Sequence, residues 1–264
     1  MKILCIGNSF SEDATNFLHP LLKSYDIDTL VVNLYIGGCS LEQHWYNIQH
    51  SKQDYLYMKN GMGISPGEPS GRIVSINEVI LEEEWDIVTI QQSSLLSGLY
   101  ESFFPEINFI LEYIKKQVKK TCELYLHEPW SWESSYQHDP NLGQNFFSKY
   151  YKCDDKYMFD QIAKTYETIS KIFQLPLIRS GNFIQFLREF DEFNFNKKES
   201  IALCRDRIHM HEIYGRYALS LLWADTLFSV DIAKCKYFPD SITELERANL
   251  NKLKEKFLVF KTNK

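Results

Sequence analysis

The sequence predicts an α/β protein, a three-layer α/β/α sandwich with a central, mostly parallel sheet of about five strands. Short apolar runs alternate with amphipathic helical segments through five rounds, a pattern typical of parallel sheets with helices on both faces. Polar residues that could do chemistry come directly after these runs, where parallel sheets bind their ligands. With 264 residues, 44% of them hydrophobic, the chain suits one domain over residues 1–264 with a substantial core.

Five short segments carry the apolar and β-branched residues of buried strands. The first is followed by Gly7 and the second by Gly37-Gly38. Right-handed crossovers between such strands bring the segments that follow them to one edge of the sheet. The predicted strands span residues 2–6, 29–35, 86–90, 123–127 and 175–178.

Apolar residues at three- and four-residue spacing predict the helices. Two stretches lack that spacing: residues 54–72, which are rich in Gly, Pro and Tyr, and residues 130–155. We expect both to be irregular excursions from the domain, the first with a short hairpin at most. The predicted helices span residues 12–24, 41–49, 73–84, 104–119, 157–173, 183–190, 213–228 and 242–257.

The composition bears on partners and location. A net charge of −6, with no run of five consecutive basic residues, argues against nucleic acid and anionic membranes as partners. The six cysteines include no CxxC pair, and several lie in apolar runs, as reduced thiols do. The apolar run at residues 3–6 is far too short for a signal peptide or a membrane helix. We therefore expect a cytoplasmic protein; its oligomeric state, a homo-oligomer included, stays open.

Ser9 follows the first predicted strand, in the segment Gly7-Asn8-Ser9-Phe10-Ser11. Gly7 permits a sharp turn out of the strand, and a serine at the start of the next helix would face the ligand-binding edge. Backbone N–H groups at a helix start favour a developing negative charge. Ser9 is therefore a candidate nucleophile. The alternative is that Ser9 or Ser11 only caps the helix.

The segment Asp206-Arg207-Ile208-His209 carries a candidate base and its partner. A serine nucleophile needs a base to take its proton, and the base needs a group that fixes its tautomer. An aspartate three residues before a histidine can be that group. His211 is a competing base, but the spacing from Asp206 favours His209.

Candidate oxyanion donors follow the second and third predicted strands. Gly38 allows the backbone to approach a reacting carbonyl and offers its N–H, although a glycine there could serve only the turn. Gln91 and Gln92 end the third strand, and strand alternation points them to opposite faces. One of the two should therefore lie at the site. We favour Gln92, which is nearer the strand end, over Gln91.

A metal site is the competing chemical interpretation, and it would make the protein a metal-dependent hydrolase. Three segments hold neighbouring residues that could ligate a metal: His209-Met210-His211, His127-Glu128 and His138-Asp139. No HExxH pattern and no cysteine pair supports them, so we expect neither a metal nor another cofactor. His127 and Trp130, near the end of the fourth strand, are instead candidates to line a substrate pocket, although packing under a lid would also suit Trp130.

Taken in order, these motifs resemble the SGNH/GDSL hydrolases. The N-terminal Ile-Gly-Asn-Ser-Phe-Ser is similar to their first block, in a variant where GNSFS replaces GDS. Ile-Gly-Gly-Cys-Ser-Leu at residues 36–41 resembles their glycine block, and Asp206-xx-His209 resembles their C-terminal block. Gly-Arg-Tyr-Ala at residues 215–218 fits an uncharacterised branch of the superfamily. The matches span residues 6–218 in the right order, so the resemblance covers most of the chain.

The resemblance implies the flavodoxin-like SGNH fold, with Ser9 as nucleophile, His209 as base and Asp206 as its orienting partner. It also implies oxyanion donors in the backbone amides of Ser9 and Gly38. The chain departs from the family in the third block, which normally supplies an asparagine, because it has Gln-Gln-Ser-Ser at residues 91–94. Carbohydrate acetylesterases in the superfamily use a glutamine in a comparable block, which favours acetylated sugars as substrates.

The sequence thus predicts a serine esterase that cleaves a small acyl ester, an acetyl ester of a carbohydrate, through an acyl-enzyme. Its partner would be a small-molecule or glycan ester. The residues expected to contact that substrate are Asn8, Gln91, His127 and Trp130. The alternative is a catalytically inactive protein of the same fold that binds carbohydrate or serves in assembly.

Overall fold

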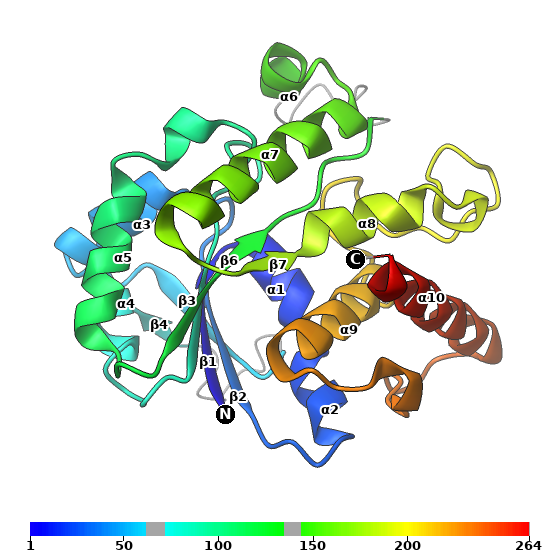
Figure 1. Cartoon of the computed structure of the whole chain (residues 1–264), viewed down its shortest axis with the longest axis horizontal. Helices are drawn as coiled ribbons and strands as arrows, with labels where there is room; N and C mark the ends of the chain where they lie inside the picture. Colours follow the sequence, from blue (N-terminus) through cyan, green and yellow to red (C-terminus); the bar gives the residue numbers. More distant parts are fainter. Residues whose placement is uncertain (62–71, 135–143, 264) are drawn as a thin grey trace.

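The computed structural model of the chain describes residues 1–61, 72–134 and 144–263. They form a sheet of seven strands in the order β4-β3-β2-β1-β5-β6-β7, with helices on both faces (Figure 1). The α/β/α sandwich expected from the sequence is confirmed. The pair His138-Asp139 and parts of the two expected excursions lie outside the described residues.

The five parallel strands are the five that the sequence predicted. β1 lies at the centre, paired with β2 on one side and β5 on the other, and β6 and β7 continue the sheet beyond β5. Their apolar side chains are buried because helices cover both faces of the sheet. The bounds are β1 (Lys2–Gly7), β2 (Leu30–Tyr35), β5 (Ile87–Ile90), β6 (Glu123–Glu128) and β7 (Leu177–Arg179).

The expected count of five strands was too low, because two antiparallel strands extend one edge. β3 (Tyr55–Lys59) pairs with β2, and β4 (Ile73–Val74) pairs with β3. Tyr55 and Tyr57 are buried, and aromatic residues at alternate positions favour a strand. The Gly- and Pro-rich composition that follows them concealed this short signal.

Two groups of helices cover the sheet. One group packs around α9, and the other packs around α5 and α7 (Figure 1). The first comprises α1 (Ser9–Thr15), α2 (Leu18–Lys23), α8 (Ser180–Arg188), α9 (Tyr214–Phe228) and α10 (Glu244–Thr262). The second comprises α3 (Leu41–Gln49), α4 (Ile76–Val79), α5 (Glu106–Gln117) and α7 (Asp155–Phe173), with α6 (Gln144–Tyr151) against α7.

Three helices differ from the prediction. The helix expected over 12–24 is split into α1 and α2, and Pro20 lies in the first turn of α2, where its missing N–H costs nothing. The helix expected over 73–84 shrinks to α4, which a capping box between Ser75 and Glu78 starts. Helix α6 forms inside the stretch 130–155, which was expected to be irregular.

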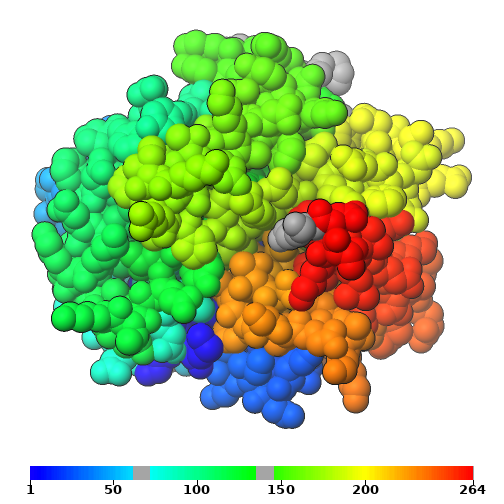
Figure 2. Space-filling model, viewed as in Figure 1, coloured from blue at the N-terminus to red at the C-terminus, as the bar shows by residue number. Residues whose placement is uncertain are grey.

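Helix α9 packs against helices from both the N-terminal and the C-terminal parts of the chain. It packs against α1 and α2 from the N-terminal part and against α8 and α10 from the C-terminal part. Figure 2 shows α2 (blue) beside α9 (orange) on one face of the molecule. No helix among the described residues combines the length and apolarity needed to cross a membrane.

The carboxyl ends of the central strands lie level with one another. Gly7 at the end of β1 is in register with Tyr35 at the end of β2, and Ile6 is in register with Ile90 at the end of β5. The segments that follow these strands therefore start side by side at one edge, as the strand pattern predicted.

Candidate active site

Ser9 is the first residue of α1 and does not cap it. The N-cap is Asn8, whose Oδ1 accepts the backbone N–H of Phe10 at 3.0 Å. A Cβ atom at Gly7 would lie 2.4 Å from Oγ of Ser11, so only glycine fits this tight exit from β1. Because Asn8 satisfies the helix end, the Ser9 hydroxyl is left for another partner.

That partner is His209, as the sequence predicted. Oγ of Ser9 lies 3.0 Å from Nε2 of His209, a residue 200 positions further along the chain. Nδ1 of His209 lies 2.7 Å from Oδ2 of Asp206. The structure thus brings hydroxyl, imidazole and carboxylate into one hydrogen-bonded row. Ser9 is 8% exposed, and the His209 side chain is 29% exposed, so the row reaches the surface.

Asp206 is held in its charged form. Burial acts to raise its pKa, but hydrogen bonds from His209 and Ile208 outweigh burial and bring the pKa below its usual range. Its Oδ1 accepts the backbone N–H groups of Ile208 at 3.0 Å and His209 at 2.7 Å. A charged Asp206 keeps the proton on Nδ1 of His209, which leaves Nε2 to accept the proton of Ser9.

The competing base, His211, is engaged elsewhere. Its Nδ1 accepts the backbone N–H of Ile213 at 3.2 Å, at the start of α9. Its ring stacks on Tyr214, with ring centroids 4.8 Å apart. His211 therefore supports the helix start, and the preference for His209 as the residue beside Ser9 agrees with the geometry.

Asp206 and His209 lie at the tip of a short hairpin. Cys204 and Met210 form an antiparallel bridge, and the N–H of Arg205 donates to the carbonyl of His209 at 2.9 Å. Arg207 adopts a positive φ of 72° at the turn. The hydrogen bonds and the turn of this hairpin therefore determine the spacing between the Asp206 carboxylate and the His209 imidazole.

Trp130 supports this tip from beneath. Its indole N–H donates to the carbonyl of Ile208 at 2.7 Å, and its ring stacks on Phe10 with centroids 4.1 Å apart. Trp130 and His127 are both 0% exposed, so neither offers surface to a substrate. The prediction that these two residues contact substrate was wrong; the alternative reading of Trp130 as a packing residue fits.

The preference for Gln92 over Gln91 as the residue nearer the site was also wrong. Gln92 is fully buried, and its amide donates to the carbonyl of Ser102 at 2.8 Å while its Oε1 accepts the N–H of Leu41 at 3.0 Å. Gln91 lies on the opposite face, as alternation required, and its Nε2 donates to Oδ1 of Asn8 at 2.6 Å. Both carboxamides are thus committed to protein acceptors.

The remaining predicted contacts, Asn8 and Gln91, are almost fully buried, and their side chains bond to other residues of the protein. Nδ2 of Asn8 donates to the carbonyl of Cys39 at 3.1 Å and thereby ties the serine turn to the glycine turn. Gly38 has a φ of 65°, which glycine adopts without strain. Among the described residues, no acceptor is hydrogen-bonded to the backbone N–H of Ser9 or Gly38, so both amides are free to bind an anion.

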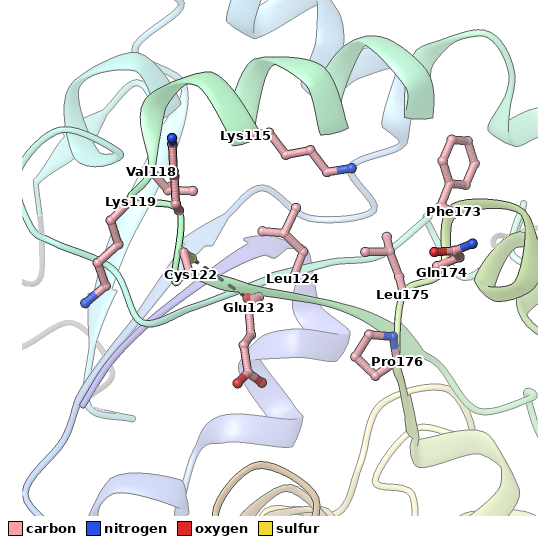
Figure 3. A pocket seen from close by; sticks show the side chains of 11 residues that line it. Lys115, Val118, Lys119, Cys122, Glu123, Leu124, Phe173, Gln174, Leu175 and Pro176 are labelled. Atoms are coloured by element: carbon pink, nitrogen blue, oxygen red, sulfur yellow. Dashed lines mark hydrogen bonds between the residues drawn. The ribbon is translucent and has the colours of Figure 1, made fainter.

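A cavity of about 620 Å³ lies at the other end of the sheet and does not border Ser9, Asp206 or His209. It lies between the start of β6, the segment leading into β7 and the end of α5 (Figure 3). Leu124 and Leu175 point into it, whereas Glu123 points away. A smaller cavity of about 420 Å³ is lined by Ser40 and the exposed side of α3, so it begins just beyond the glycine turn.

The part of the chain that the structure describes has no group of three or more His, Cys, Asp or Glu side chains placed to share a metal ion. His127 bonds to Gln91 and to Ser180. His138 and Asp139 lie outside the described residues. The geometry therefore gives the metal alternative no specific support.

The sequence analysis missed Asp13 and Arg205, which lie close to Ser9, Asp206 and His209 along the chain and bond to each other at 2.9 Å. Asp13 is 0% exposed and follows Ser9 by four residues. The sequence feature that could have pointed to Asp13 is its charge on the otherwise apolar face of α1, at helical spacing from Phe10 and Ala14.

The fold is that of the SGNH hydrolases, as the motifs suggested. An acetyl xylan esterase superposes with a TM-score of 0.56 at 12% identity, over 86% of this chain and 100% of its own. A lipase/acylhydrolase from Enterococcus faecalis gives a TM-score of 0.52 at 12% identity, over 86% and 94%. At these identities the likeness is one of fold.

The chain belongs to the family described as Domain of unknown function (DUF4886), whose model matches residues 2–254. The crystal structure of a DUF4886 family protein from Bacteroides uniformis is similar, with a TM-score of 0.82 and 27% identity, over 98% of this chain and 95% of that one. No curated protein sequence matches the chain significantly.

Proposed function

We propose that this protein is a serine esterase that removes an acetyl group, or another small acyl group, from a carbohydrate ester. One observation carries the proposal: Oγ of Ser9 lies 3.0 Å from Nε2 of His209, whose Nδ1 lies 2.7 Å from Asp206. Nucleophile, base and orienting carboxylate in this row are what acyl transfer by a serine requires.

In the proposed reaction, Nε2 of His209 takes the proton of Ser9 while Oγ attacks the ester carbonyl. The imidazolium that results is stabilised by Asp206 and then protonates the leaving alcohol, which gives an acyl-enzyme. Water, activated by the same imidazole, attacks the acyl-enzyme and releases the acid. Both halves of the reaction use one base, so no cofactor is required.

The developing oxyanion would be held by the backbone amides of Ser9 and Gly38. Both lack an acceptor within the described residues, and the bond from Asn8 to Cys39 joins the two turns that carry them. A carboxamide as a third donor, which the sequence favoured, is no longer part of the proposal, because Gln91 and Gln92 donate to Asn8 and Ser102.

Two observations support a carbohydrate as the alcohol part. The solved structures that share the fold include an acetyl xylan esterase. The cavity beside Ser40 is lined by Trp45, Tyr46 and Gln43, together with other polar side chains of α3. Aromatic faces with a few polar groups are common in small-molecule sites, and they suit a sugar with its apolar faces and hydroxyl groups.

The test is hydrolysis of p-nitrophenyl acetate and of acetylated xylo-oligosaccharides, compared with longer acyl esters. We expect turnover that falls with acyl length and is lost in Ser9→Ala. A fluorophosphonate should label the wild type and Ser11→Ala but leave Ser9→Ala unlabelled. Ser11 is the matched control, because it lies on the same turn and donates to the carbonyl of Asn8.

Labelling at another serine, with Ser9 inert, would refute the assignment of the nucleophile. Absence of turnover on the whole ester panel, combined with retained binding of xylo-oligosaccharides, would instead identify a carbohydrate-binding protein with the same fold. Turnover that a chelator abolishes and a divalent cation restores would point to a metal-dependent hydrolase.

A further inference from the structure

Asp13 is a buried carboxylate within one turn of Ser9. It lies on α1, four residues after Ser9, and it is 0% exposed. Its Oδ1 accepts from Nη1 of Arg205 at 2.9 Å and from Nε of Arg216 at 2.8 Å. Its Oδ2 accepts the backbone N–H of Met210 at 2.9 Å. Three donors from outside its own helix thus converge on this carboxylate.

Two of these donors, Arg205 and Met210, lie on the two strands of the hairpin that carries Asp206 and His209. Met210 directly follows His209, and Arg205 directly precedes Asp206. Nη1 of Arg205 also donates to the carbonyl of Met210 at 2.5 Å. The base of the hairpin is therefore fastened at the two residues that flank the predicted catalytic pair.

Arg216 adds the first turn of α9 to the same cluster. Besides Asp13, it pairs with Glu12 at 2.9 Å, and both side chains of that second pair are largely buried. The cluster therefore links α1, the hairpin and α9. Within it, only Asp13 bonds directly to the hairpin backbone from the helix that carries Ser9.

We propose that Asp13 is a positioning residue, which clamps the hairpin bearing Asp206 and His209 onto the helix bearing Ser9. The clamp fixes the distance between Oγ of Ser9 and Nε2 of His209. This inference rests on the proposed esterase function, because it concerns how that site is assembled.

Energetics favour a role in geometry over one in stability. Burying a carboxylate with two guanidinium groups costs much of what their attraction returns, and apolar residues often give equal or greater stability in such places. Directional bonds from three donors, in contrast, restrict the hairpin to one placement. A displacement of about 1 Å between reacting groups can cost about 100-fold in rate, so such a restriction matters for catalysis.

The experiment measures kcat and KM for p-nitrophenyl acetate in Asp13→Asn, in the wild-type and His209→Ala backgrounds. We expect Asp13→Asn to lower kcat by about 10- to 100-fold with little change in KM. In the His209→Ala background we expect no further loss of the residual rate, because there is no imidazole left to position. Such non-additivity is the mark of residues that act as a unit.

Glu12→Gln is the matched control, because it removes a carboxylate one residue away that pairs with Arg216 and does not bond to the hairpin. We expect its kcat to stay near that of the wild type. The low-field NMR signal of the proton between His209 and Asp206 should weaken in Asp13→Asn and persist in Glu12→Gln.

An equal fall of kcat in both backgrounds would overturn the clamp, since Asp13 would then act on the fold alone. An unchanged kcat in folded Asp13→Asn would overturn it as well. If Asp13→Asn does not fold, Arg205→Gln, whose side chain is 30% exposed, takes its place with the same expected non-additivity. Full activity in His209→Ala would refute the proposed esterase mechanism instead, so the two failures are distinguishable.

Discussion

Nδ1 of His127 lies 2.6 Å from Oε1 of Gln91, and this contact sets the direction of a buried chain of hydrogen bonds. Gln91 uses its amide N–H on Asn8, so its Oε1 must accept and Nδ1 of His127 must carry the proton. Nε2 of His127 then accepts from Ser180 at 3.0 Å. Trp223 closes the chain by donating to Oγ of Ser180 at 3.3 Å.

This series of buried hydrogen bonds explains why the imidazole of His127 is neutral and why the side chain of Asn8 is held in one orientation. Complete burial lowers the pKa of His127 to about 3. A neutral imidazole with one donor and one acceptor satisfies both neighbours, which a charged ring could not do. This series of hydrogen bonds therefore holds the Asn8 carboxamide next to Ser9 from the interior of the protein.

The first prediction separates the two adjacent glutamines. Gln91→Ala removes the donor to Asn8, so the turns carrying Ser9 and Gly38 should loosen, and kcat should fall about 10- to 100-fold with KM little changed. Gln92→Ala leaves the buried N–H of Leu41 without its acceptor and should lower stability by about 1–3 kcal/mol, with kcat nearly unchanged. Ester turnover and thermal unfolding of both variants test this. Equal kcat losses would contradict it.

The second prediction concerns the glycine turn. Gly38→Ala places a side chain at a φ of 65°, which costs about 1–2 kcal/mol, and relaxation of that strain should move the backbone N–H. We expect kcat to fall by up to about 100-fold. Gly37→Ala is the control, because its Cβ would meet only the hydroxyl of Tyr35, at 3.5 Å. Normal turnover in Gly38→Ala would remove this amide from the proposed oxyanion site.

The third prediction tests Asp206, the carboxylate of the proposed triad. Asp206→Asn keeps an acceptor for the backbone N–H groups of Ile208 and His209 but loses the charge that fixes the imidazole tautomer. We expect kcat to fall by up to about 10⁴-fold with the fold intact by circular dichroism. Glu212→Gln removes an exposed carboxylate from the same segment and should have little effect. A small loss in Asp206→Asn would mean that His209 is oriented by other groups.

The fourth prediction is a dependence of stability on pH. Burial lowers the pKa of both His44 and His127 to about 3, whereas unfolded histidines titrate near 6.5. Between these values the unfolded chain binds more protons, so the free energy of unfolding must fall as pH falls. The slope should approach about 1.4 kcal/mol per pH unit for each histidine.

Urea unfolding between pH 7 and pH 5 measures this slope, in a range where most carboxyl groups remain ionised. His44→Gln should reduce the slope by up to about 1.4 kcal/mol per pH unit, since the contribution of one buried imidazole is then absent. A slope that is the same in the variant and the wild type would show that His44 does not stay neutral in the folded protein.

The sequence was sufficient for the parallel strands and for the three residues of the row. Apolar runs such as residues 3–6 mark strands buried on both faces, and serine, aspartate and histidine are residue types whose combination has few other uses. The antiparallel β3 was expected at most as part of a short hairpin outside the sheet, because its alternation covers only five residues, from Tyr55 to Lys59, next to a Gly- and Pro-rich stretch.

The sequence could not show which face of the sheet each side chain occupies, or which residues distant in the sequence bond to one another. Alternation requires Gln91 and Gln92 to point apart, but only the packing of the helices around β1 and β5 shows which face Asn8 occupies. Likewise, the bond between Asp13 and Met210 joins residues separated by 197 positions, and no local pattern encodes such a contact.

The short strands at the borders of the sheet bear on how the protein behaves when crowded. β4 contributes two residues at one border and β7 contributes three at the other. An incoming strand from another molecule would find too few free backbone groups for a lasting pairing, a device that commonly guards against edge-to-edge aggregation. Within the part of the chain that the structure describes, the sheet borders therefore offer copies of the protein little backbone through which to polymerise.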